Sequence, residues 1–264
     1  MNYTKDVIRG GPGVTQVRKL AELEQFRREQ ESVRPLSLWN PMLPPGTVNA
    51  SDDEFNDQAL AAAWTEFDPG THLTVTEGKY GLRMAKLGIV AGSEVAGICK
   101  ALPAGNFSIS TYLSNLGSGV TNIFDGIGIC LWEDPTNNAA KLFTFNYSFS
   151  NTYTVTFASY EWTNYTTAVA PAKYTDTEAY MLSSGYFMRL RRNAANYYIE
   201  YSVDGIGWYS PNALAAITIS FTPTYMGLFK NVPSTATTGY SLFQFFRYLG
   251  SDVGIYGILE GDRM

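Results

Sequence analysis

The feature that most constrains the fold is a run of alternating residues that enters an Asp-Gly turn. The run begins at Tyr197, reaches Asp204 and Gly205, and leaves the turn through Trp208. Asp-Gly tolerates positive φ at both central positions and therefore matches the twist of a two-residue hairpin. Immediately upstream, residues 187–196 have the pattern of the preceding strand and its turn. The pattern predicts an antiparallel β meander.

Strand-like segments separated by turn residues continue from residue 51 onward. Eighteen Tyr and fifteen Phe fit strands better than helices. About a dozen short strands without intervening helices predict an all-β fold, an antiparallel two-sheet jelly-roll sandwich. We expect residues 126–132 and 196–203 to be central strands, residues 163–184 to form a long loop, and Trp208 to pack against the sandwich. The expected strands are 73–75, 80–87, 93–102, 107–113, 126–132, 141–149, 153–162, 186–192, 196–203, 217–220, 225–230 and 242–249.

Composition excludes two classes of function. Charged residues make up 16% of the chain and the formal net charge is −5. Basic clusters are confined to residues 27–28 and 189–192, so nucleic acid is not an expected partner. No apolar run approaches the roughly 20 residues that span a bilayer. The N-terminus also lacks the apolar segment of a signal peptide, which predicts synthesis in the cytoplasm.

Residues 1–50 differ in kind from the rest. Residues 14–34 are charge-rich with good helix formers, and their apolar residues recur every third position, which favours one helix on a partner surface over a coiled coil. Residues 34–46 form an apolar, proline-rich arm. We therefore expect an anchoring helix and arm at 1–50, a sandwich at 51–250 and a tail at 251–264. The expected assembly residues are Leu20, Leu23, Phe26, Leu36, Leu38, Trp39, Met42 and Leu43.

Catalytic and metal-binding patterns are sparse. The chain has one histidine, His72, which is too few for a zinc site and a weak basis for a Ser or Cys triad. Cys99 and Cys130 lie in apolar runs and are expected to be buried thiols. The acidic residues 52–57 could offer oxygen ligands to calcium, but their spacing matches no calcium loop, so we expect a solvated turn. No cofactor or metal is predicted.

Aromatic residues near residue 160 are the candidate ligand site. Along the expected strand, Tyr160 and Trp162 share a face with several threonines, and Tyr165 follows. A threonine-rich face is expected to be wet, which would leave the three rings exposed. Such rings could bind a glycan or a protein partner, although packing within the domain is the commonest fate of such residues.

Several ordered motifs resemble the concanavalin A-like lectin and glucanase family of jelly rolls. They extend over roughly residues 52–250 and include residues 53–64, 102–107, 126–134, 189–208 and 243–248. The resemblance implies a fold that occurs in lectins, glucanases, carbohydrate-binding modules and phage virion proteins. The glucanase motif Glu-x-Asp-x-x-Glu has no match, and the adjacent Glu133 and Asp134 would point to opposite faces of a strand. On these grounds the chain is predicted not to be an enzyme.

The first functional hypothesis is a structural or adhesive virion protein of a bacteriophage, such as a capsid decoration, tail fibre or receptor-binding component. It would dock on other virion proteins through residues 1–50, occupy the virion surface in several copies or as a homo-oligomer, and take a host glycan as a further partner. The alternative is a carbohydrate-binding module or lectin-like protein without a virion role.

Overall fold

The described part of the chain consists of strands and their connections. The structure, a computed structural model, describes residues 50–87, 94–116, 126–149, 155–170, 172–178, 185–205, 207–211, 215–232 and 240–250. The chain divides into two compact units, Met1–Pro45 and Gly46–Met264, and every described residue belongs to the second. The expected helix, the arm with its assembly residues, and the tail lie outside the described residues.

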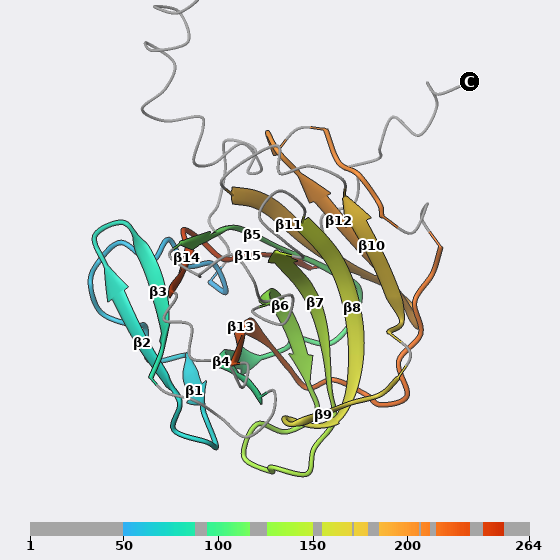
Figure 1. Ribbon diagram of the computed structural model, residues 1–264, viewed down its shortest axis with the longest axis horizontal. Coiled ribbons are helices and arrows are strands. Elements are labelled where there is room, and N and C mark those ends of the chain that lie inside the picture. Colours follow the sequence, from blue (N-terminus) through green and yellow to red (C-terminus); the bar gives the residue numbers. More distant parts are fainter. Residues whose placement is uncertain are drawn as a thin grey trace, which may run out of the picture. The chain divides into compact units, whose positions relative to one another are not determined.

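One sheet has eight strands, all paired antiparallel (Figure 1). Every residue of β6 is buried, and β6 lies between β13 and β7, which confirms residues 126–132 as a central strand. In spatial order the strands are β1 (Thr65–Phe67), β4 (Glu94–Ala101), β13 (Tyr225–Val232), β6 (Ile127–Trp132), β7 (Leu142–Phe149), β8 (Val155–Asn164) and β10 (Tyr174–Glu178), with β9 (Thr167–Ala168) paired to β8.

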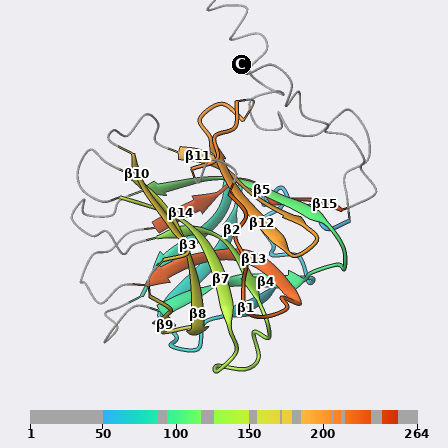
Figure 2. The ribbon, with the colours of Figure 1, turned by 90° about the vertical axis from the view of Figure 1, so that its right-hand side faces the viewer.

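The second sheet has seven strands, and Figure 2 shows both sheets after a 90° turn. Its order is β12 (Asn196–Ser202), β11 (Gly185–Asn193), β5 (Phe107–Leu116), β14 (Tyr240–Phe243), β3 (Gly81–Lys86) and β2 (Leu73–Gly78), with β15 (Arg247–Gly250) paired to β5. The prediction that residues 196–203 are central is wrong, because β12 ends this order. Alternation of apolar and polar residues indicates that one face of a strand is buried. Edge strands and central strands can both have one buried face, so the pattern does not distinguish them.

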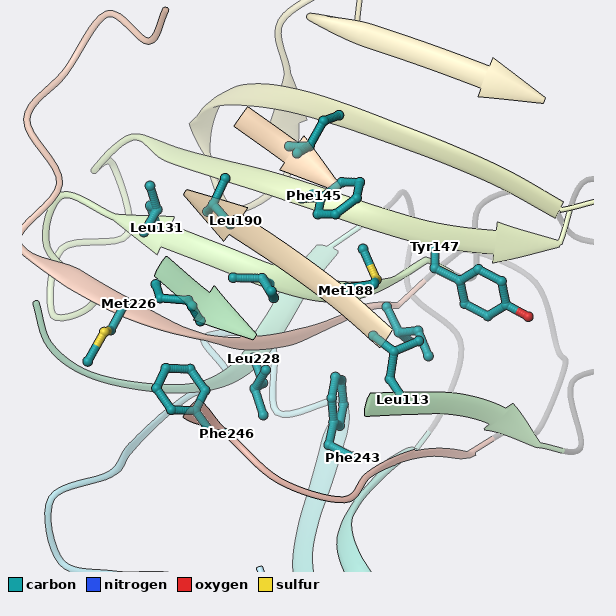
Figure 3. Close-up of a cluster of buried hydrophobic side chains, with 14 of the residues drawn as sticks. Leu113, Leu131, Phe145, Tyr147, Met188, Leu190, Met226, Leu228, Phe243 and Phe246 are labelled. Atoms are coloured by element: carbon teal, nitrogen blue, oxygen red, sulfur yellow. The ribbon is translucent and has the colours of Figure 1, made fainter. Parts of the chain in front are cut away.

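The main core lies between the two sheets. Leu131, Phe145 and Leu228 come from the eight-stranded sheet, while Leu113 and Leu190 come from the seven-stranded sheet (Figure 3). All five are fully buried, and each such side chain stabilises the fold by about 1.5–3 kcal/mol. Two packed antiparallel sheets around one core confirm the predicted sandwich. Within the described ranges, no helix has the length and hydrophobicity needed to cross a membrane.

The two predicted turns around β12 have different outcomes. Asn193 pairs with Asn196 across a two-residue turn, as expected, and Ala194 takes a φ of 55° there. The Asp-Gly turn is longer than a two-residue hairpin, because the chain returns to β12 only at Tyr209. The carboxylate of Asp204 accepts the Gly207 N–H at 2.9 Å, which holds the backbone in a wider turn.

The expected long loop at residues 163–184 is also corrected. It contains β9 and β10, and β10 pairs with β8 over five residues. Residues 217–220 form no strand, and Ile217 makes an isolated bridge to Tyr197. Strand β1 is short and was not expected. Such short edge pairings are decided by the strand that they meet, and local propensity carries little signal for them.

Candidate functional site

The candidate site lies on the outer face of the eight-stranded sheet, meaning the face turned away from the seven-stranded sheet. Successive residues of a strand point to opposite faces. In β8, Val155 and Phe157 belong to the main core, so Tyr160 and Trp162 lie on the outer face. Apolar residues of β1, β4, β13, β6 and β7 join Trp162 in a second buried cluster. The outer face therefore has a hydrophobic layer of its own.

The strand register arranges large side chains in a row across this face. Tyr225 of β13 lies opposite Trp132 of β6, which lies opposite Leu142 of β7. Leu142 in turn lies opposite Trp162 of β8. With neighbouring strands about 4.8 Å apart, this aromatic row extends about 14 Å across the sheet. The row runs perpendicular to the strands and draws on four of them.

The structure brings together the three residues predicted to bind a ligand. The rings of Tyr160 and Trp162 have centroids 6.4 Å apart, and Tyr160, Tyr165 and Tyr225 pack half-buried against the cluster. The expected exposure is wrong for Trp162, which is 4% exposed and donates its Nε1–H to Thr144 Oγ1 at 2.9 Å. Alternation placed Trp162 on the correct face, but it carries no information about how deeply the neighbouring side chains bury a residue there. Tyr225 was missed because it lies at least 60 residues from the other three in sequence.

Trp132 lies in the aromatic row and offers a buried hydrogen-bond donor. Its side chain is 1% exposed, and its ring packs edge-on to Phe67 with centroids 4.1 Å apart. The indole Nε1–H has no hydrogen-bond partner in the described part of the chain. Buried polar groups in folded proteins are nearly always hydrogen-bonded. The donor therefore marks a place where a buried water would complete the bonding.

Two buried asparagines, which lie away from the aromatic row, also have a side-chain polar atom without a hydrogen-bond partner among the described residues. Asn146 of β7 lies opposite Gly128, and the backbone N–H of Asn231 of β13 donates to Gly126. Their side chains are 6% and 5% exposed, and the Oδ1 atom of each lacks a partner among the described residues. The outer face thus combines aromatic rings with an indole donor and amide acceptors, which complement hydroxyl groups.

Cys99 and Cys130 also lie on the outer face, on either side of Gly227. Both are buried and free, as expected. Burial raises the pKa of the Cys99 thiol to about 12 and also raises the pKa of the Cys130 thiol. At neutral pH both thiols are protonated, so they act as small apolar groups.

The acidic segment near residue 52 fastens the chain to the sandwich. Asp52 accepts the backbone N–H of Tyr248 at 2.7 Å, and Asp53 accepts the indole N–H of Trp64 at 2.7 Å. The lone histidine, His72, contacts Glu94 elsewhere, with Nδ1 and Oε2 3.0 Å apart. In the described ranges, no group of three or more His, Cys, Asp or Glu side chains could hold a metal ion.

One carboxyl pair had no signal in the sequence. Glu77 of β2 and Asp57 are 20 residues apart, yet the Asp57 N–H donates to Glu77 Oε1 at 3.1 Å and their carboxyls share a hydrogen bond. Burial raises the pKa of Glu77 to about 7, whereas the hydrogen bond to Glu77 lowers the pKa of Asp57. Carboxyls in contact are closer than the roughly 5–9 Å that separates the catalytic pair of glycosidases, so this pair lacks that geometry.

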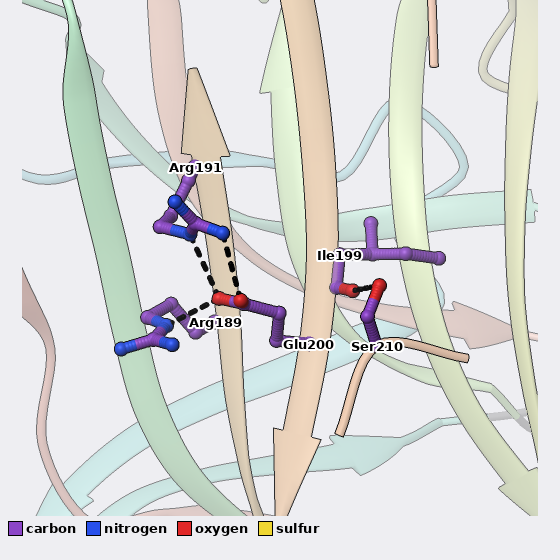
Figure 4. Close-up of polar contacts among 5 residues, drawn as sticks. All are labelled: Arg189, Arg191, Ile199, Glu200 and Ser210. Carbon is purple, nitrogen blue, oxygen red and sulfur yellow. Dashed lines mark hydrogen bonds and ion pairs between the residues drawn. The ribbon is translucent and has the colours of Figure 1, made fainter. Parts of the chain in front are cut away.

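The outer face of the seven-stranded sheet carries an ion cluster around a buried glutamate instead (Figure 4). Glu200 of β12 accepts hydrogen bonds from Arg189 at 2.5 Å and from Arg191 at 2.8 and 2.9 Å. The ring of Trp208 covers Arg189, with the guanidinium carbon 4.0 Å from the ring centroid. Trp208 therefore packs against the sandwich as predicted, although it is half-buried. Two of the three clustered arginines are held in an internal ion pair network.

The chain matches no family model and no curated protein. Solved structures share its fold. The GH43 BlXynB protein from Bacillus licheniformis aligns with a TM-score of 0.54 and 14% identity, over 79% of this chain and 41% of that one. The xylan beta-1,4-xylosidase from Bacillus halodurans C-125 aligns with a TM-score of 0.51 and 12% identity, over 78% of this chain and 40% of that one. A functionally unknown protein from Saccharomyces cerevisiae aligns with a TM-score of 0.50 and 12% identity, over 71% of this chain and 95% of that one.

At these identities the likeness concerns the fold. It confirms the antiparallel two-sheet jelly-roll sandwich that the sequence predicted. The chain spans about two fifths of the length of the two Bacillus proteins.

The prediction about enzyme activity is corrected. The missing carboxylate motif led to the prediction that the chain is not an enzyme, but glycoside hydrolases are among the proteins that share its fold. The absence of one motif excludes one arrangement of carboxylates and does not exclude enzymes, so that prediction is wrong.

Proposed function

We propose that the chain recognises neutral carbohydrate through the outer face of its eight-stranded sheet. The observation that carries this proposal is the group of half-buried tyrosines, Tyr160, Tyr165 and Tyr225, that packs beside the aromatic row. Aromatic faces attract the C–H side of a sugar ring through their quadrupole. Tyrosine hydroxyls both donate and accept hydrogen bonds, so they can pair with the hydroxyls of the sugar. A few polar groups on an otherwise apolar surface are typical of small-ligand sites.

Two further observations favour a neutral sugar. In the described strands β4, β13, β6, β7 and β8, the residues that face outward include no charged side chain. An acidic sugar would therefore find no cation among them. Proteins that share the fold include a xylan beta-1,4-xylosidase, which makes xylan the first polysaccharide to test.

The test is electrophoresis of the full chain through gels that contain soluble xylan or mixed-linkage β-glucan. We expect the wild type to be retarded, and Tyr160→Ala and Tyr225→Ala to be retarded less. Tyr80→Ala is the matched control, since Tyr80 is 76% exposed at the β2–β3 turn, away from the site. Trp162→Ala is a poor probe, because removing a buried ring also opens a cavity.

Two results would contradict the proposal. If neither polysaccharide retards the wild type, the proposed function is wrong. If both tyrosine variants are retarded like the wild type while their melting temperatures are unchanged, the site is wrong.

The virion hypothesis stays a prediction beside this proposal. It depends on residues 1–50, which almost entirely lie outside the described residues. A glycan-binding sandwich would suit a particle-bound adhesin and a free protein equally. We expect the full chain to oligomerise and a chain without residues 1–50 to be a folded monomer, which light scattering would measure. Two monomers would contradict an assembly role for this segment.

A further inference from the structure

Tyr209 is the exposed end of a column of aromatic rings that begins in the main core. Phe157 stacks on Tyr201 with ring centroids 3.8 Å apart and planes 7° apart. Tyr201 stacks on Tyr209 at 5.9 Å and 23°. The exposed fraction rises along the column from 0% through 8% to 61%. The ring of Tyr209 thus rests on Tyr201 and remains mostly open to solvent.

The backbone holds Tyr209 in place. Tyr201 and Tyr209 exchange two backbone hydrogen bonds of 2.8 Å each. The hydroxyl of Ser210 donates to the carbonyl of Ile199 at 3.3 Å (Figure 4), and the preceding residue, Trp208, packs on the Arg189 guanidinium. A ring that is fixed before binding loses little conformational entropy when a ligand stacks on it.

We propose that Tyr209 is a second carbohydrate-binding platform, which stacks on the C–H face of a neutral pyranose. This inference rests on the proposed function and adds a site on the other sheet, beside the edge strand β12. The negative face of a tyrosine ring attracts the C–H groups of a sugar. The turn before Tyr209 carries the exposed carboxylate of Asp204, which disfavours an acidic sugar.

A protein partner fits this position less well. In the described part of this turn, the other exposed large apolar side chain is Val203, at 48%. Specific protein interfaces bury about 800 Å² on each partner, which is far more than two side chains provide. One flat ring is sufficient for one sugar ring.

The experiment uses the same electrophoresis with the full chain and soluble xylan, supplemented by titration with xylohexaose. We expect Tyr209→Ala to weaken binding to xylan about tenfold, because two sites on one long ligand reinforce each other. Tyr209→Phe keeps the ring and should bind like the wild type. A Tyr160→Ala/Tyr225→Ala variant should keep a residual affinity that disappears when Tyr209→Ala is added.

The outcomes separate this inference from the proposed function. Tyr209→Ala is tested in the wild type and in the Tyr160→Ala/Tyr225→Ala variant. If the wild type binds and the substitution weakens binding in neither, the platform is wrong while the outer-face site stands. If only Tyr209→Ala weakens binding, the platform is supported and the outer-face site is wrong. A wild type that binds neither xylan nor xylohexaose overturns both. Melting temperatures close to the wild type, expected for so exposed a ring, show that the variants fold.

Discussion

Replacing Glu77 with glutamine should make the stability of the protein less dependent on pH. Glu77 is 8% exposed in β2. Burial is the largest cause that raises its pKa from 4.5 to about 7, and the carboxyls of Asp57 and Asp53 add to it. Glutamine has the shape of a protonated glutamic acid but cannot ionise. The substitution therefore removes the titration and leaves the packing in place.

The sign follows from proton binding. Between pH 4.5 and about 7 the folded chain keeps a proton on Glu77 that the unfolded chain has released. The stability that this proton contributes is complete below pH 4.5 and is lost as the pH rises through 7. At about 1.4 kcal/mol per pKa unit, the loss amounts to about 3 kcal/mol. The pKa of Asp57 is lowered from its ordinary value of 3.8, so its titration changes the stability only at a pH below this window.

Urea unfolding followed by tryptophan fluorescence at pH 4.5, 6 and 8 would measure the effect. We expect Glu77→Gln and the wild type to be similarly stable at pH 4.5, and the variant to be more stable by about 3 kcal/mol at pH 8. Glu66→Gln, at an exposed position of β1, is the control and should follow the wild type. Parallel curves for Glu77→Gln and the wild type would refute the reasoning, because Glu77 would then be ionised in the fold throughout.

Two further predictions concern stability and use the same unfolding assay. A Cβ at Gly227 would lie 2.0 Å from the carbonyl oxygen of Ile98, so Gly227→Ala should cost about 3 kcal/mol or more, whereas Gly78→Ala, with its nearest atom at 3.8 Å, should be within about 0.5 kcal/mol of the wild type. An equal loss in both would show that the close approach is not the cause. Glu200→Gln leaves two largely buried arginines without their carboxylate and should cost about 3 kcal/mol. A near-neutral Glu200→Gln would show that the ion cluster is solvated.

The sandwich was predictable because its signals are local. Two-residue alternation shows which residues of a strand share a face, and the turn at residues 193–196 is read from four adjacent residues. The same alternation could not show that β12 is an edge strand, because it does not indicate how many strands pair with it. It also could not foresee β10, whose pairing depends on the position of β8.

The candidate site was predictable in part for the same reason. Tyr160 and Trp162 were placed on one face correctly, because they are two residues apart on one strand. The burial of Trp162 and the contribution of Tyr225 depend on neighbouring strands, so no local pattern reports them. The carboxyl pair of Glu77 and Asp57 likewise arises only when distant segments meet.

The sequence by itself determined the fold class, the faces of most strands and the hairpin at residues 193–196. Those properties depend on steric preferences within a few residues of backbone. The tertiary structure alone decided which face acquires a second hydrophobic layer, which polar groups are buried without a partner, and which carboxyl keeps its proton. These depend on burial and on neighbours contributed by distant strands, and burial is a property of the packed molecule.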